Sequence, residues 1–284
     1  MTPVQDILSM QYSYAAAKAA MSRLNKILTL KTEKSADKIL TGNDVDIKLQ
    51  HLNFSYSEDK PILRDITLQI PAGSKVALIG ASGSGKTTLA QIIAGFYERD
   101  NGALLYNGID IDTLDKHSLR AKIFLVLQMP ILFNASLRFN INMGDANISD
   151  AQIYEALEIA QLNEMIEGMK EGLDTIVGRH GIRLSGGQRQ RLSIARMIIA
   201  NPSVVIFDES TSALDVHTEA KLQAALVPLM KDKTLITIAH RLSTVKGADT
   251  IYVLEDGAIV QQGSHEELED EEGHYNQFLK KQLL

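Results

Sequence analysis

The sequence has no cysteine among its 284 residues, which excludes disulfide bonds and thiolate metal sites and suits the cytosol. It also lacks any run of about 18 apolar residues and the apolar core of a secretory signal peptide, so we expect a soluble, untargeted chain. Positive charge is scarce: 29 Lys and Arg stand against 35 Asp and Glu, a net charge of -6. That deficit argues against nucleic acid as the main partner, because nucleic acids bind basic surfaces.

Hydrophobic residues are plentiful, at 45% of the chain, which is enough to fill a substantial core. The length suits one large domain or two small ones. We find no internal repeat, and the one strongly biased segment is the acidic run from Glu266 to Glu272, which indicates a solvated surface.

The most informative stretch runs from Gly80 to Thr87 and has the form G-x-x-x-x-G-K-T, typical of a phosphate-binding loop. Glycine lets the backbone curl around phosphates and aim its NH groups inward. We expect Lys86 to neutralise the β and γ phosphates and Thr87 to bind Mg²⁺. Residues 74–79 read as a buried strand and residues 87–93 as a helix, which is the order that this loop requires. The sequence therefore predicts a nucleoside triphosphate site.

The N-terminal residues 3–30 have apolar side chains near helical spacing, which predicts one long amphipathic helix beginning at Pro3. Basic residues outnumber acidic ones here: Lys18, Arg23, Lys26, Lys31 and Lys34 against Asp6 and Glu33. The excess fits a helix near anionic headgroups or leaving a membrane, and equally an ordinary solvated face. Residues 34–43, which are polar and contain Gly42, read as a linker.

Two strand-like segments, residues 46–56 and 62–70, predict an antiparallel sheet ahead of the phosphate-binding strand. Residues 102–108 read as a further hairpin-like piece, and residues 251–261 as a closing hairpin. Tyr56 stands at the end of the first segment, where its ring can stack on a nucleotide base or simply pack on the protein.

From residue 136 to residue 200 the pattern becomes helical, with helices expected at residues 151–162, 163–170 and 189–200. Ser185, Gly186, Gly187 and Gln188 open the last of these. A serine and two glycines at a helix start form either a second anion site or a plain capped terminus, and the residues alone leave both interpretations open.

Polar residues follow three strand-like segments: Gln128 after residues 123–127, Asp208 and Glu209 after residues 204–207, and His240 after residues 235–239. The carboxyl ends of parallel strands are where open α/β sheets bind ligands. Asp208 can hold a Mg²⁺ water, and Glu209 can orient or deprotonate an attacking water. In isolation, Gln128 reads as a capping residue and His240 as a hydrogen-bonded core residue.

Together, and in this order, these motifs resemble the nucleotide-binding domain of ATP-binding cassette (ABC) transporters from about residue 45 to the C-terminus. The resemblance implies an α/β fold: a P-loop NTPase (RecA-like) core with an antiparallel β subdomain and a helical signature subdomain over about residues 136–200. Leu184 to Gln188 match the signature of the family. Residues 1–42 would then form the N-terminal helix and linker, and residues 43–284 the cassette.

The resemblance implies ATP and Mg²⁺ as cofactors. The residues expected to act in catalysis are Lys86, Gln128, Glu209 and His240, and those expected to hold Mg²⁺ are Thr87, Gln128 and Asp208. Contacts to ATP are expected from Tyr56, Gly80, Ser82, Gly83, Ser84, Gly85, Lys86, Thr87, Thr88, Ser185, Gly186, Gly187, Gln188 and Asp215. The ring of Tyr56 is expected to matter more than its hydroxyl, so that Tyr56→Phe is nearly neutral.

The segments 128–137 and 240–245 are similar to the exporter branch, whose cassette follows a membrane domain on the same chain. Residues 1–30 would then be the cytoplasmic end of the last transmembrane helix. The implied partners are that membrane domain and a second cassette, identical or not, at the cytoplasmic face of a membrane, such as a bacterial inner membrane. Ile176 and Arg179 replace two glutamates usual in exporters, and we expect both to face the membrane domain.

Two alternatives to the transport motor follow from the same resemblance. A soluble ABC ATPase of translation or DNA repair normally has two cassettes or a long coiled coil between the phosphate-binding loop and the signature. This chain has one cassette with short helices in that span. A catalytically silent regulatory cassette would bind ATP without turnover, and the presence of Glu209 and His240 argues against it.

Overall fold

The computed structural model describes residues 3–30, 33, 36–57, 60–127, 129–208, 216–239 and 242–282. Among the expected site residues, Gln128, Glu209, Asp215 and His240 lie outside these ranges. The chain divides into two compact units, Met1–Ser35 and Ala36–Leu284.

The first unit is built on a single helix, α1 (Pro3–Leu28), as the apolar spacing predicts. From Met10 onward its side chains are exposed, including the large apolar Tyr12 and Leu24. Within the ranges that the structure describes, no helix has both the length and the apolar character needed to cross a bilayer.

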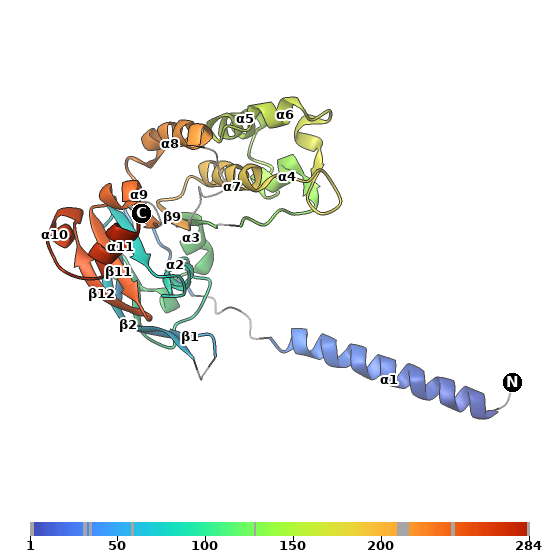
Figure 1. Ribbon diagram of the computed structural model, residues 1–284. Coiled ribbons are helices and arrows are strands. Elements are labelled where there is room, and N and C mark those ends of the chain that lie inside the picture. The colour runs from blue at the N-terminus through green and yellow to red at the C-terminus, as the bar shows by residue number, and fades with distance from the viewer. Residues whose placement is uncertain are drawn as a thin grey trace. The chain divides into compact units, whose positions relative to one another are not determined.

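The larger unit contains a six-stranded sheet in the order β12-β11-β3-β10-β9-β6. Figure 1 shows β11 and β12 of this sheet side by side. Its strands are β3 (Lys75–Gly80), β6 (Ile123–Val126), β9 (Val204–Asp208), β10 (Thr234–Ile238), β11 (Thr250–Glu255) and β12 (Ala258–Gly263). All neighbours are parallel except β11 and β12. The central strands are nearly continuous apolar runs because both faces of a parallel sheet are covered.

A second, antiparallel sheet has the order β2-β1-β4-β5, which confirms the predicted β subdomain. Its strands are β1 (Ile47–Ser55), β2 (Pro61–Ile70), β4 (Asn101–Tyr106) and β5 (Ile109–Asp110). Buried residues alternate with partly exposed ones along much of β1 and with exposed ones along much of β2, because one face of this sheet packs on the core. Asn107 and Gly108, with φ of 48° and 76°, form the tight turn between β4 and β5.

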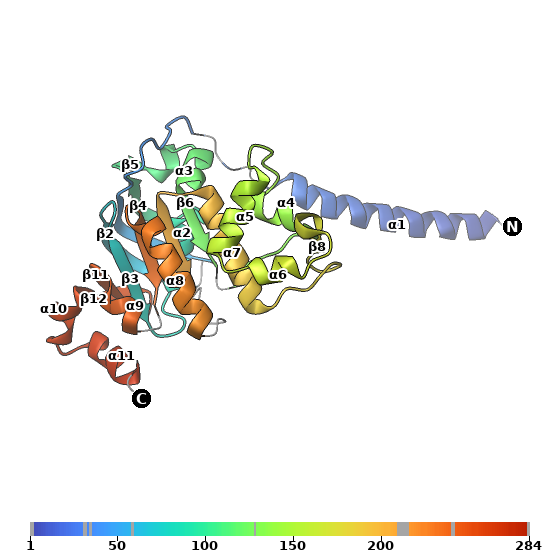
Figure 2. The same ribbon diagram turned by 90° about the horizontal axis from the view of Figure 1, so that it is seen from above.

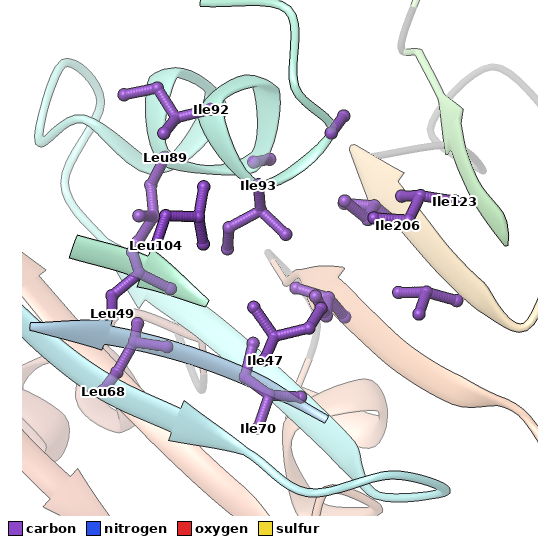
Figure 3. Close-up of a cluster of buried hydrophobic side chains, with 14 of the residues drawn as sticks. Ile47, Leu49, Leu68, Ile70, Leu89, Ile92, Ile93, Leu104, Ile123 and Ile206 are labelled. Atoms are coloured by element: carbon purple, nitrogen blue, oxygen red, sulfur yellow. The ribbon is translucent and has the colours of Figure 1, made fainter. Parts of the chain in front are cut away.

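Helix α2 (Lys86–Ile93) packs against both sheets and shares one apolar core with them (Figure 3). The antiparallel sheet contributes Ile47, Leu49, Leu68, Ile70 and Leu104, the helix contributes Leu89, Ile92 and Ile93, and the parallel sheet contributes Ile123 and Ile206. This burial fixes α2, and therefore the loop that precedes it, relative to both sheets.

Figure 2 shows a mainly helical part of this unit. This part has an apolar core of its own. Its helices are α4 (Leu137–Asn142), α5 (Asp150–Ile159), α6 (Asn163–Glu167) and α7 (Gly186–Ala200), and α7 packs against α4 and α5. The helix expected at residues 163–170 is too long, because α6 ends at Glu167. Beyond it, Gly172 and Gly178 adopt positive φ, and β8 (Ile176–Val177) pairs with β7 (Ala135–Ser136).

Several helices have no counterpart in the sequence analysis: α3 (Lys116–Lys122), α8 (Val216–Met230), α9 (Leu242–Lys246), α10 (His265–Glu269) and α11 (His274–Gln282). Four of the five span fewer than ten residues, too few for a clear apolar period. The acidic side chains from Glu266 to Glu272 are exposed, as expected, but Leu268 between them is buried.

The linker prediction fails at Leu40, whose side chain is buried in the main core. The Leu40 amide donates to Ser118 Oγ (3.2 Å), and Lys38 pairs with Leu114. These contacts hold the polar segment before β1 against the rest of the unit. The sequence does not predict them, because the segment is short, polar and without periodicity.

Candidate functional site

The predicted phosphate-binding loop connects the central strand β3 to α2 at the carboxyl edge of the parallel sheet. Asp208 ends β9 at the same edge, because Ile238 of β10 pairs with both Leu78 and Asp208. One strand separates β3 from β9, so their ends lie roughly 10 Å apart. The strand order thus brings the loop and the Asp208 carboxylate together, as the sequence analysis expected.

Lys86 is buried and its ammonium is surrounded by oxygen atoms of its own loop. The Lys86 Nζ donates to the carbonyls of Gly80 (3.0 Å) and Ala81 (2.7 Å) and lies 3.3 Å from Ser84 Oγ. The loop therefore holds a positive charge at its centre with hydrogen bonds to neutral oxygens. An anionic phosphate is a stronger acceptor for that ammonium than a carbonyl, so this charge is poised for a triphosphate.

The backbone of the loop depends on its three glycines, Gly80, Gly83 and Gly85, for different reasons. A Cβ on Gly80 would lie 2.1 Å from the carbonyl oxygen of Leu254, so no side chain fits there. At Gly83 an added Cβ would meet nothing within 4 Å, but the φ of 83° disfavours other residues. Gly85 is the N-cap of α2 and has no side chain that could accept a hydrogen bond from the first-turn amides, a helix start at which an anion can bind. These features fit a bound phosphate chain.

The two threonines after the lysine differ in environment. Thr87 is exposed at the mouth of the loop, where a hydroxyl can reach a metal ion, and Thr88 is buried. Ser82 is exposed and Ser84 is buried within the loop. Hydroxyl and carboxylate oxygens are ligands that Mg²⁺ accepts, so Thr87 and Asp208 suit the ion that accompanies a triphosphate.

Tyr56 lies just after β1, with 54% of its surface exposed. Its ring is edge-on to those of Phe54 (centroids 4.9 Å apart) and Tyr97 (5.3 Å). Its hydroxyl lies 3.1 Å from Thr88 Oγ1 and 3.5 Å from Gln91 Oε1, both on α2. The hydroxyl thus has a structural contact, which revises the expectation that Tyr56→Phe is nearly neutral.

Ser185 begins α7 through a capping box. The Gln188 amide donates to Ser185 Oγ (3.2 Å), and the Ser185 amide donates to Gln188 Oε1 (2.8 Å). Ser185 and Gly186 are exposed, and Gly187 and Gln188 are partly exposed. The serine hydroxyl accepts in this cap and keeps its own proton for another acceptor. Within the described residues, no hydrogen bond joins Ser185 to the loop at residues 80–87.

A buried polar network in the helical part has no signal in the sequence analysis. Asn140 of α4 is fully buried, and its Oδ1 accepts from the Phe133 amide and from Arg196 Nη2, both at 2.9 Å. Its Nδ2 donates to the carbonyls of Phe133 (3.0 Å) and Ser136 (3.1 Å). Arg196 Nη1 donates to the Ile131 carbonyl (2.8 Å). An asparagine and an arginine in helical segments carry no motif, so only the fold reveals this link.

Arg196 belongs to α7, the helix that Ser185 caps. Burial lowers the pKa of its guanidinium, whose contacts in the described chain are with carbonyl and amide oxygens. The segment after Gln128 is therefore attached to the helix that begins at the signature residues. Ile176 and Arg179, expected to face a membrane domain, are both exposed.

Comparison with known proteins finds relatives of nearly the whole chain among ABC transporters and flippases. The chain is 41% identical over 286 residues to the ATP-dependent lipid A-core flippase of Escherichia coli (strain K12), which covers 100% of this chain and 49% of the flippase. It is 41% identical over 277 residues to ABC transporter B family member 21 of Arabidopsis thaliana, covering 95% of this chain and 21% of the plant protein. The chain thus spans about half, or less, of the length of these relatives.

A solved structure of a bacterial Atm1-family ABC exporter with ATP bound has the same fold, with a TM-score of 0.87 and 34% identity over 99% of this chain and 50% of that chain. The expected architecture of a P-loop core, an antiparallel subdomain and a helical subdomain is thereby confirmed. The model of the ABC transporter family matches residues 63–212, which hold the phosphate-binding loop, the signature and Asp208. This chain belongs to the ABC transporter family.

Proposed function

We propose that this chain is the ATP-binding and ATP-hydrolysing motor of an ABC exporter. The observation that carries the proposal is the buried Lys86 ammonium, held by oxygen atoms of a glycine-shaped loop at the sheet edge where Asp208 also lies. A buried cation, a carboxylate at the same sheet edge and the N-terminus of a helix together suit a nucleoside triphosphate with its Mg²⁺.

The binding roles follow from the chemistry of each side chain. Lys86 neutralises the β and γ phosphates, and the residues from Gly80 to Thr88 surround them. Thr87, Gln128 and Asp208 supply oxygen ligands, direct or through water, to Mg²⁺. Tyr56 offers its ring to the base, since a π face stacks on a purine.

The hydrolytic roles belong to residues outside the described ranges. Glu209 follows Asp208 in the sequence and takes a proton from the attacking water, and His240, two residues after the end of β10 in the sequence, helps to orient that water. Their places in the sequence, each just past a strand of the parallel sheet, support these roles.

Half of each site is supplied by a second cassette in this proposal. Ser185, Gly186, Gly187 and Gln188 of one copy face the triphosphate held by the other, with Asp215 at the interface. The exposed helix start at Ser185 supports this arrangement. The names of the flippase and the exporter among the relatives support a membrane domain as the further partner and the cytoplasmic face of a membrane as the location.

Two alternatives lead to different results. A soluble ABC ATPase would hydrolyse ATP without any response to a membrane domain, and a silent cassette would bind ATP without hydrolysis. The exposure of Ile176 and Arg179 supports neither the soluble ATPase nor the silent cassette, because a partner domain can still cover the surface on which both residues lie.

The test of the proposal is the ATPase rate of Lys86→Ala. Turnover should fall by roughly 100- to 1,000-fold, because the transferred phosphoryl group loses its nearest positive charge. Lys75→Ala is the matched control, since Lys75 is exposed at the other end of β3. Wild-type turnover in Lys86→Ala would show that this loop does not serve the reaction.

A further inference from the structure

Tyr56, the aromatic residue proposed to bind the base, is held by contacts with two other rings. Tyr56 meets Phe54 and Tyr97, and these two rings also meet each other, with centroids 5.5 Å apart. Phe54 is buried in the main core, whereas Tyr97 remains 40% exposed. The three rings form a cluster that is anchored in the core at one side.

The turn that follows α2 places Tyr97 in this cluster. Gly95, with φ of 74°, follows the helix, and its amide donates to the Ile92 carbonyl while the Phe96 amide donates to the Gln91 carbonyl, both at 2.9 Å. These two bonds form a Schellman motif, which fixes the direction in which the chain leaves the helix. Tyr97 comes two residues after Gly95.

Both contacts that hold Tyr56 therefore come from the helix that follows the phosphate-binding loop or from the turn directly after that helix. Tyr97 confines the ring from the turn after α2, and Thr88 holds the hydroxyl from the first turn of α2. A tyrosine at the end of a strand would otherwise sample several rotamers and would lose that freedom when a base binds.

We infer that Tyr97 is a positioning residue that holds the Tyr56 ring ready for the base of the nucleotide. This inference rests on the proposed ATP site and deepens it. Tyr97 acts through its ring, because no hydrogen bond of its hydroxyl is present among the described residues. It touches Tyr56 and is not itself assigned a contact with the nucleotide.

The experiment measures binding of two probes to the full chain: the non-hydrolysable ATP analogue AMPPNP and inorganic triphosphate, which has no base. Tyr97→Ala should weaken AMPPNP binding by about two- to tenfold, as expected for loss of an aromatic pair, and leave triphosphate binding unchanged. Tyr97→Phe should restore wild-type binding. The matched control is Phe96→Ala, since Phe96 is exposed in the same turn and has no ring contact in the described residues.

A double-mutant cycle supplies the second readout. In a Tyr56→Ala background, Tyr97→Ala should have no further effect on AMPPNP binding, because its effect passes through Tyr56. Unchanged AMPPNP binding in Tyr97→Ala, equal loss for both probes, or an additive double mutant would each overturn the inference. Failure of the wild-type chain to bind either probe would instead overturn the proposed function itself.

Discussion

The hydroxyl of Tyr56 connects two parts of the proposed ATP site that are 32 residues apart in the sequence. It lies 3.1 Å from Thr88 Oγ1, and Thr88 itself is expected at the phosphates. Either hydroxyl can donate in this pair, so one hydrogen bond links the base platform to the first turn of α2. Tyr56 therefore depends on its hydroxyl for orientation and on its ring for stacking.

We predict that Tyr56→Phe weakens ATP binding roughly twofold to tenfold, the effect of one lost hydrogen bond. Tyr56→Ala should cost more, about 1 to 3 kcal/mol, because the stacking surface is lost as well. Equilibrium titration with ATP measures both. Equal affinity for Tyr56→Phe and the wild type would show that the Thr88 contact does not orient the ring.

At the scale of elements, α4 and α7 are joined by a fully buried asparagine. The side-chain oxygen of Asn140 accepts from both Arg196 and the Phe133 amide. Its NH₂ group donates to carbonyls of the preceding segment. A buried network in which every member is satisfied specifies one arrangement of the elements that it joins. The segment after Gln128 and the helix after Ser185 should move together.

We predict that Asn140→Ala lowers the free energy of unfolding by about 2 to 4 kcal/mol, because it leaves buried donors and acceptors without partners. Urea unfolding measures the loss, and hydrogen exchange should place it in α4 and α7. Asn142→Ala is the matched control on the same helix, since its bonds to Gly144 and Asp145 are local. Similar losses in both variants would show that the network has no special role.

Helices α10 and α11 are joined through a buried tyrosine. The Tyr275 hydroxyl lies 2.7 Å from His265 Nδ1, and Tyr275 packs with Leu268 in the core beneath the two helices. Burial, and then the charges of Glu269 and Glu266, raise the pKa of Tyr275 to about 12. The folded state therefore keeps the phenol protonated at a pH where an unfolded tyrosine ionises.

The sign of the pH effect follows from that raised pKa. The stabilisation by Tyr275 is complete below pH 10, the usual tyrosine value, and is lost as the pH rises toward 12. We predict that Tyr275→Phe reduces the loss of stability between these values, as measured by urea midpoints across that range. Tyr154→Phe, which changes an exposed tyrosine, is the matched control. An unchanged slope in Tyr275→Phe would contradict the assignment.

At the scale of the whole molecule, the proposed reaction needs two cassettes. Within the described residues, the signature residues at the start of α7 make no hydrogen bond to the phosphate-binding loop of the same copy, and in the proposal a second copy brings them to the triphosphate. Bound ATP is then part of the interface, and its cleavage weakens the dimer.

We predict that Glu209→Gln hydrolyses ATP more slowly by orders of magnitude but still binds it, because an amide keeps the shape of the carboxylate and cannot accept the proton. The variant should accumulate as a dimer when ATP is added, since ATP favours the closed state. Light scattering with and without ATP measures this. A protein that stays monomeric with its sites saturated would point to a heterodimer with a different cassette.

Much of the site was predictable because its residues are neighbours in the sequence. Each feature lies at the end of a strand or helix that the local sequence pattern predicts: the loop from Gly80 to Thr87, the cap at Ser185 and the carboxylate of Asp208. The helix expected at residues 163–170 was overextended because α6 ends at Glu167 and Gly168, a poor helix former, is its C-cap. Leu40 was assigned to a linker because a single buried residue leaves no periodic pattern.

The sequence by itself determined the proposed chemistry of this protein: which loop is proposed to hold phosphates, which lysine lies in that loop, and which strand ends in carboxylates. Each of these depends on residue types at short fixed spacing. Only the tertiary structure decided that the ring of Tyr97 contacts that of Tyr56 and that Arg196 donates a hydrogen bond to Asn140, 56 residues away in the chain. The physical reason is that such contacts are made by packing between distant segments, whose geometry depends on the order of strands and the burial of helices rather than on any local pattern.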